Sequence, residues 1–110
     1  MKIINIFFKN KIKDLEINNE WVKGLIIEDE DANFYQLEFI TIDCVRKIVK
    51  QDSYMLTIPY RLIVNKINLE SILKSIQKLE EKDFFKYQKK IPKPNNEENE
   101  KWIILEQNNL

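Results

Sequence analysis

Apolar residues alternate with polar ones along three segments in the first half of the chain. Residues 2–9, 20–28 and 33–42 are rich in β-branched and aromatic side chains with a period of two, which predicts three β-strands. In the third segment Tyr35, Leu37 and Phe39 share one face, and the opposite face is also mostly apolar, so we expect a central strand. Residues 54–58 and 61–67 predict a further strand interrupted at Pro59, and residues 101–107 predict a closing strand.

The hydrophobic period changes from two to about 3.6 residues after Asn68. Leu69, Ile72 and Ile76 recur at three- and four-residue steps, and the Asn68 side chain can accept hydrogen bonds from the free amides of a first helical turn. Asp83 then occupies an inward position, so we expect the helix to bend or stop there. The pattern predicts an α+β fold: a mostly antiparallel sheet with one long amphipathic helix, about residues 68–82, packed on one face, and with room for a second, short helix.

Two segments fit more than one secondary structure. Residues 44–50 have helical spacing but β-branched content, so helix and strand both stay open, and residues 11–17 are equally ambiguous. Residues 91–100 contain two prolines and a polar run, which predicts a loop. The length of 110 residues fits one globular domain, residues 1–110, with one hydrophobic core.

Composition and charge narrow the class of protein. Hydrophobic residues make up 44% of the chain and charged residues 33%, which indicates a folded protein with a well-solvated surface. The 18 basic and 18 acidic side chains balance, which argues against a general nucleic-acid coat protein. The charges are segregated, however: residues 28–43 carry a net charge of −6 and residues 61–93 a net charge of +5.

The chain lacks the residues that most enzymes use. It has no histidine and only one glycine, which excludes Ser–His and Cys–His arrangements and glycine-rich phosphate loops. The single cysteine, Cys44, allows no internal disulfide, favours a reducing cytoplasm, and is best interpreted as a buried, inert thiol. No run is long enough to span a membrane. We therefore expect no catalytic residues, no metal and no cofactor; the enzyme alternative would be a metal-dependent nuclease using the acidic run, or Glu80 with Lys82.

The sequence EDED at residues 28–31 separates two predicted strands. One interpretation is a charged turn that discourages edge-to-edge pairing with other chains. The other is a surface for a partner, because clustered carboxylates fit the cationic cleft of a nuclease and complementary charge speeds encounter. Trp21, Tyr54 and Tyr60 are further aromatic candidates for anchoring such a contact. The predicted partner-binding residues are Glu28, Asp29, Glu30, Asp31, Tyr35, Glu38 and Asp43.

A second candidate site lies in residues 82–93, where lysines are interleaved with aromatic residues. Lysines neutralise phosphates and aromatic rings stack on bases, which is the combination that holds single-stranded nucleic acid. The alternative is structural, because lysines favour helix C-termini and paired phenylalanines usually pack in a core. The residues concerned are Phe85, Lys86, Tyr87, Lys89 and Lys90.

A small α+β chain with segregated charge, an acidic EDED segment and no catalytic set resembles the bacterial immunity proteins that neutralise toxins of contact-dependent inhibition and other polymorphic toxin systems. The resemblance is one of type over the whole chain. It implies a non-enzymatic cytoplasmic inhibitor that binds a cognate protein toxin, often a nuclease domain. The alternative function is a nucleic-acid-binding accessory protein that uses residues 82–93.

Overall fold

The computed structural model describes residues 2–8, 20–94 and 101–104. Three strands follow the first-half pattern: β1 (Ile3–Phe8), β2 (Trp21–Asp29) and β3 (Phe34–Thr41). After them come α1 (Ile42–Asp52), β4 (Arg61–Val64), α2 (Leu69–Glu81), the 3₁₀ turn η2 (Phe84–Tyr87) and β5 (Lys101–Ile104). The predicted α+β class is confirmed. The ambiguous residues 11–17, and parts of the predicted C-terminal loop and strand, lie outside the described residues.

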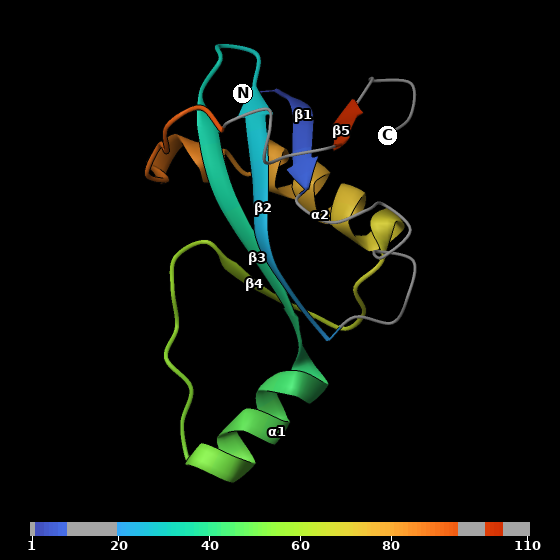
Figure 1. Ribbon diagram of the computed structural model, residues 1–110, viewed down its shortest axis with the longest axis vertical. Helices are drawn as coiled ribbons and strands as arrows, with labels where there is room; N and C mark the ends of the chain where they lie inside the picture. Colours follow the sequence, from blue (N-terminus) through green and yellow to red (C-terminus); the bar gives the residue numbers. More distant parts are fainter. Residues whose placement is uncertain (1, 9–19, 95–100, 105–110) are drawn as a thin grey trace.

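The five strands form one mixed sheet in the order β4-β3-β2-β1-β5 (Figure 1). The pairings β1–β2, β2–β3 and β1–β5 are antiparallel, whereas β3 and β4 are parallel. Parallel neighbours need a crossover connection of a dozen or more residues. Here α1 and residues 53–60, which we call the return segment, supply that crossover.

Helix α2 forms where the 3.6-residue period predicts it and covers one face of the sheet. The Asn68 side chain accepts a hydrogen bond from the Ser71 amide at 2.8 Å, and the Ser71 hydroxyl accepts from the Asn68 amide at 3.0 Å, which completes a capping box. Ile72 and Ile76 are fully buried in the same core as the Tyr35, Leu37 and Phe39 face of β3. The helix ends before Asp83, whose φ of 53° is left-handed, as the break in the hydrophobic pattern indicates.

A second helix, α1, occupies the segment that the sequence left undecided. Thr41 caps it by accepting a hydrogen bond from the Cys44 amide at 3.1 Å, and Ser53 at φ 71° ends it. The structure therefore has a second, shorter helix besides α2, in a segment for which the sequence leaves helix and strand open. Figure 1 shows α1 extending from the end of β3 beyond the sheet, at the opposite end of the molecule from the β2–β3 turn.

The predicted strand at residues 54–58 is wrong. These residues have no regular secondary structure and run back from α1 to β4 as part of the return segment. The backbone groups of a strand need a neighbouring strand to pair with, and residues 54–58 lie away from the sheet between α1 and β4 (Figure 1). Consequently its apolar side chains do not enter the main core.

Candidate functional site

The acidic turn between β2 and β3 is built around a buried carboxylate, Asp29, which is fully buried. Its Oδ1 accepts hydrogen bonds from the backbone amides of Asp31 at 2.9 Å and Asn33 at 3.0 Å. Its Oδ2 accepts from the Asn33 side-chain amide at 3.2 Å and from the Tyr35 hydroxyl at 3.1 Å. Four donors on one carboxylate hold the turn together, so Asp29 stabilises the hairpin.

The titration of Asp29 and Tyr35 reflects this contact. Burial alone raises the pKa of Asp29, but the hydrogen bonds from Asn33, Asp31 and Tyr35 outweigh it and leave the pKa below its ordinary value. Burial, together with the neighbouring negative charge of Asp29, raises the pKa of Tyr35 to about 12. The pair therefore keeps a charged acceptor and a protonated donor across the physiological range.

The other acids of the turn divide into two kinds. Glu28 is partly buried and accepts a hydrogen bond from the Asn5 side-chain amide at 2.8 Å, which ties β2 to β1. Glu30 and Asp31 are exposed, and neither forms an ion pair within the described part of the chain. At the turn, Glu30 and Asp31 thus present carboxylates that pair with no other described residue.

The remaining predicted partner-binding residues do not extend this surface. Tyr35 is 1% exposed, and Glu38 is buried in an ion pair with Arg61. Asp43 is exposed, but it lies in the first turn of α1, paired with Arg46 at 3.5 Å, at the far end of the molecule from the turn. The structure therefore buries Asp29, Tyr35 and Glu38, contrary to the expectation that these side chains face a partner, because sequence charge does not show which carboxylates fold inward.

Arg61 connects the sheet, the return segment and Trp21. Its Nε donates to Oε2 of Glu38 on β3, and its Nη1 donates to the Leu56 carbonyl in the return segment. Its guanidinium carbon lies 5.6 Å from the centre of the Trp21 ring, while Lys23 Nζ lies 3.8 Å from the same centre. Arg61 thus holds the return segment at a fixed position beside Trp21.

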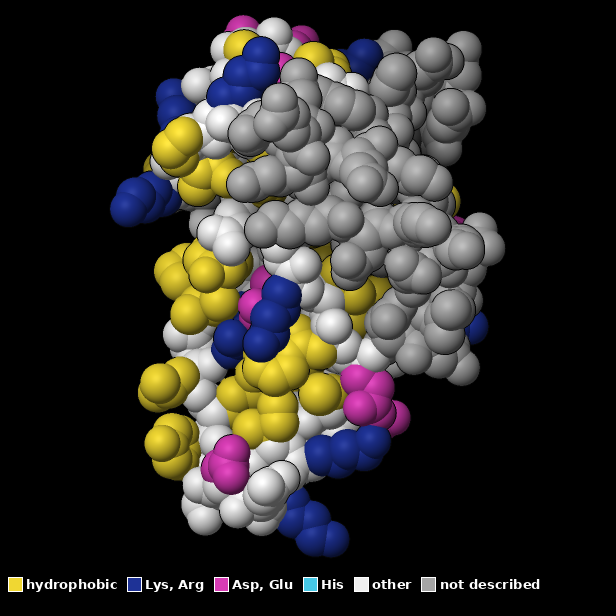
Figure 2. All heavy atoms as spheres, in the orientation of Figure 1, with side chains coloured by type: hydrophobic (Ala, Val, Ile, Leu, Met, Phe, Trp, Pro, Cys, Tyr) yellow, Lys and Arg dark blue, Asp and Glu magenta, His cyan; other side chains and the backbone are white. Residues whose placement is uncertain are grey.

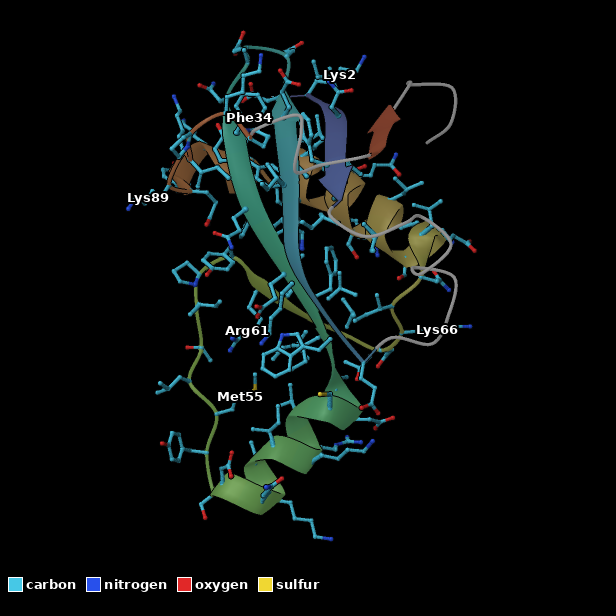
Figure 3. All side chains as sticks on the ribbon, viewed as in Figure 1. Lys2, Phe34, Met55, Arg61, Lys66 and Lys89 are labelled. Carbon is cyan, nitrogen blue, oxygen red and sulfur yellow. The ribbon has the colours of Figure 1, made fainter. Side chains whose placement is uncertain are left out.

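An apolar groove opens between α1, the return segment and the end of the sheet, with a volume of about 360 Å³. Figure 3 shows Met55 pointing from the return segment toward the sheet, on the same side as Arg61. Figure 2 shows hydrophobic side chains gathered over this end of the molecule. The residues lining the apolar groove are Trp21, Ile48, Asp52, Tyr54, Met55, Leu56 and Arg61.

The rim of the apolar groove carries unusually exposed large side chains. Leu56 is 75% exposed and Tyr54 is 64% exposed, and both line the groove. Large apolar side chains that gather on one part of a surface commonly mark a contact site, whereas single scattered ones do not. The candidate site of this protein is therefore the apolar groove.

The lysine-rich segment follows α2 and is divided between core and surface. Phe85 is 1% exposed and packs against Tyr35, with ring centres 5.4 Å apart. The prediction of Phe85 as a stacking platform is therefore wrong, and the structural interpretation holds for it. Tyr87 is 82% exposed, and Lys86, Lys89 and Lys90 are exposed with it.

The chemistry expected of the enzyme alternative is not assembled among the described residues. They contain no group of three acids or cysteines placed to hold a metal ion. Cys44 is buried in α1. Oε1 of Glu80 accepts a hydrogen bond from the Ile3 amide at 2.7 Å, so this carboxylate anchors the start of β1 on α2.

In the described part of the chain, neither helix has the length and apolar character that a membrane crossing requires. Comparisons with protein-family models, curated proteins and solved structures find no match. The function must therefore be argued from the chain's own residues.

The sequence does not predict the apolar groove. Trp21 and Tyr54 are aromatic candidates in the hypothesis of a contact made by the acidic residues, whereas the structure places both in the groove lining. Met55, Leu56 and Ile48 carry no sequence signal for a groove, because residues 54–58 resemble a strand and residues 44–50 fit either a helix or a strand. The Arg61–Glu38 pair joins residues 23 positions apart, and no local pattern predicts such a pair.

Proposed function

We propose that this protein is a non-enzymatic inhibitor that binds a partner protein through the apolar groove. The observation that carries the proposal is the exposure of Tyr54 and Leu56 around a groove lined by Trp21. Burying such side chains in a complex removes apolar area from water, at roughly 25 cal/mol per Å². Their exposure in the free chain is therefore a cost that a partner relieves.

The composition of the apolar groove suits a protein partner. Tryptophan, tyrosine and arginine are the residues most enriched among those that dominate binding energy at protein interfaces. Here Trp21, Tyr54 and Arg61 line one groove, and Arg61 fixes the position of its neighbours through hydrogen bonds. A groove whose walls are held in place loses less conformational entropy on binding.

The chemistry of the partner follows from the groups around the apolar groove. Lys23 is exposed and holds its charge over the face of the Trp21 ring, which lines the groove. The fitting partner presents an apolar side chain for the groove, flanked by a carboxylate that pairs with the Lys23 ammonium.

A role as a toxin-neutralising immunity protein fits this mode of action. An inhibitor of that kind needs a rigid scaffold and one contact surface, and it needs no catalytic group. In this proposal the partner is the cognate toxin domain, and the exposed carboxylates of Glu30 and Asp31 contribute long-range attraction rather than the central contact. The finer residue assignment thus moves from the acidic turn to the apolar groove.

Site-specific photo-crosslinking in the native cell tests the proposal. A benzoylphenylalanine placed at Tyr54, on the rim of the apolar groove, is compared with one placed at Asp31, on the acidic turn; both positions are exposed. We expect one discrete protein adduct at position 54 and none at position 31. An adduct at position 31 alone would move the interface to the acidic turn, and the absence of an adduct at both positions would contradict the proposal.

A further inference from the structure

The outer edge of β3 is covered along only part of its length. Near one end, the Ile91 amide donates to the Phe34 carbonyl at 2.8 Å; further along, the Glu38 amide donates to the Tyr60 carbonyl at 2.9 Å. Gln36 lies between these two points. A pocket forms at this interruption, where the return segment and the residues after η2 approach the strand from either side.

We call this cavity the tyrosine pocket, and its volume is about 360 Å³. That volume lies in the range of small-molecule sites, which begins at roughly 300 Å³. Its walls combine two aromatic rings, two side-chain amides and one ammonium group, and none of the described lining residues is acidic. The lining residues are Gln36, Pro59, Tyr60, Tyr87, Gln88, Lys89 and Ile91.

Tyr87 is the most exposed large hydrophobic residue in the described part of the chain, at 82%. The packing of its neighbour Phe85 in the core fixes η2, and this leaves Tyr87 at the surface beside the pocket. A ring that covers one wall of a pocket while its face stays in water offers a platform for another flat ring.

Positive charge lies beside the same opening. Lys89 lines the tyrosine pocket, and Figure 3 shows its side chain extending outward from that end of the molecule, on the same side as Phe34. Lys86 Nζ lies 5.6 Å from the centre of the Tyr87 ring, and Lys90 is exposed next along the chain. None of the three lysines forms an ion pair with another described residue. The charge is available to an anion.

We infer that the tyrosine pocket binds a nucleotide unit. The base stacks on Tyr87 and Tyr60, the amides of Gln36 and Gln88 meet the donors and acceptors on its edge, and Lys89 with Lys86 or Lys90 pairs with the phosphate. A phosphate ion alone would contact the lysines but not the aromatic rings or the side-chain amides, so it would not account for the composition of the pocket. The same chemistry belongs to a free mononucleotide and to one residue of a single strand.

This site is distinct from the apolar groove. The two linings share no residue, so each can be altered separately. The inference stands without the proposed inhibitor function, and its failure would leave that function untouched.

Titrations followed by two-dimensional amide NMR test the inference on the full chain. The probes are AMP, UMP, inorganic phosphate and an oligothymidine of twelve residues. The variants are Tyr87→Ala, Tyr87→Phe and Lys89→Gln, and Lys50→Gln removes an equally exposed lysine from α1 as the matched control. Because Tyr87 is so exposed, its variants are expected to fold normally, which thermal unfolding checks.

We expect saturable shifts at Gln36, Tyr60, Gln88 and Lys89 on adding nucleotide, and only diffuse shifts with inorganic phosphate. Loss of the Tyr87 ring should weaken binding about tenfold or more, while Tyr87→Phe and Lys50→Gln should change it by less than about threefold. Saturation by AMP or UMP identifies a free nucleotide as the ligand; binding only by the oligothymidine identifies a single strand. Shifts spread over every exposed lysine, or unchanged binding by Tyr87→Ala, would overturn the inference.

Discussion

The hydroxyl of Tyr35 donates a hydrogen bond to Oδ2 of Asp29 across 3.1 Å, between two side chains that are both buried. Because of this contact, the acidic EDED segment has a structural role. The Asp29 carboxylate stabilises the hairpin and does not contribute to an acidic surface. The stability of the β2–β3 turn should therefore depend on it.

Replacing Asp29 with Ala removes an acceptor from two backbone amides, a side-chain amide and a hydroxyl. An unpaired donor costs about 1–3 kcal/mol where water cannot reach it; because Asp31 is exposed and Asn33 partly so, water can replace the acceptor for most of these donors, and we expect a total loss of about 2–4 kcal/mol in the free energy of unfolding. Tyr35→Phe removes one donor and should cost about 1 kcal/mol. Urea unfolding measures both, and a loss below 1 kcal/mol for Asp29→Ala would contradict the assignment.

The contribution of Asp29 should also depend on pH. Its pKa in the folded chain lies below the ordinary value of 3.8, so its stabilisation is fully present above that value and is lost as pH falls through the folded pKa. The Asn variant has no carboxylate to titrate. The advantage of the wild type over Asp29→Asn should be constant above about pH 5 and should shrink toward pH 2.5. A difference that does not change over this range would exclude the mechanism.

The pKa of Glu80 is shifted upward, in the opposite direction to that of Asp29. Burial raises its pKa, although the Ile3 amide that donates to it partly opposes that shift. A raised carboxyl pKa means that the folded state penalises the ionised form, so stability falls as pH rises from the ordinary value of 4.5 through the folded pKa. Glu80→Gln keeps an acceptor without the charge, and it should be more stable than wild type at pH 7 but equal to it near pH 3.

The control for Glu80 is its replacement by Ala, which leaves the buried Ile3 amide unpaired. We expect a loss of about 1–3 kcal/mol at pH 7. Chemical unfolding at the two pH values separates the charge from the hydrogen bond. A Gln variant that is less stable than wild type at pH 7 would show that the negative charge itself is favourable here.

Removing either partner of the Arg61–Glu38 ion pair should strongly lower the free energy of unfolding. Its side chains are 13% and 7% exposed, and removing one partner of a buried pair leaves an uncompensated charge that costs about 3–5 kcal/mol. Arg61→Ala should also release the return segment, because the bond to the Leu56 carbonyl disappears. Limited proteolysis within residues 54–58 detects that release.

Arg46 provides the matched control for this pair. Its ion pair with Asp43 is exposed on both sides, so Arg46→Ala should change stability by less than about 0.5 kcal/mol and should not expose residues 54–58 to cleavage. Equal losses for the two arginine variants would show that the pair at Arg61 has no special role.

The sequence predicts what local spacing determines. The step from Leu69 to Ile72 and Ile76, with Asn68 ahead, specifies α2, and the alternation of Tyr35, Leu37 and Phe39 specifies the inward face of β3. These patterns depend only on the period of the element and on which side is buried.

The sequence does not predict what depends on distant neighbours. Residues 54–58 have strand composition but no adjacent strand, so Leu56 ends at the surface. The charges of the EDED segment look alike in sequence, yet only Asp29 meets four donors; the asparagine four positions later was the one local signal. Arg61 reaches Glu38 and Trp21 only after the sheet forms, so neither the ion pair nor the apolar groove is visible in the linear pattern.

The most direct test of the proposed function is the affinity of the purified chain for the partner identified by crosslinking, measured by calorimetry with two variants altered at exposed positions. Leu56→Asp places a charge on the rim of the apolar groove, and Glu30→Ser with Asp31→Ser removes the free carboxylates of the turn. We predict that Leu56→Asp weakens binding by about 100-fold or more, and that the double serine variant weakens it by less than about threefold at physiological salt. Full affinity in Leu56→Asp, together with a large loss in the serine variant, would contradict the proposal that the apolar groove is the contact surface.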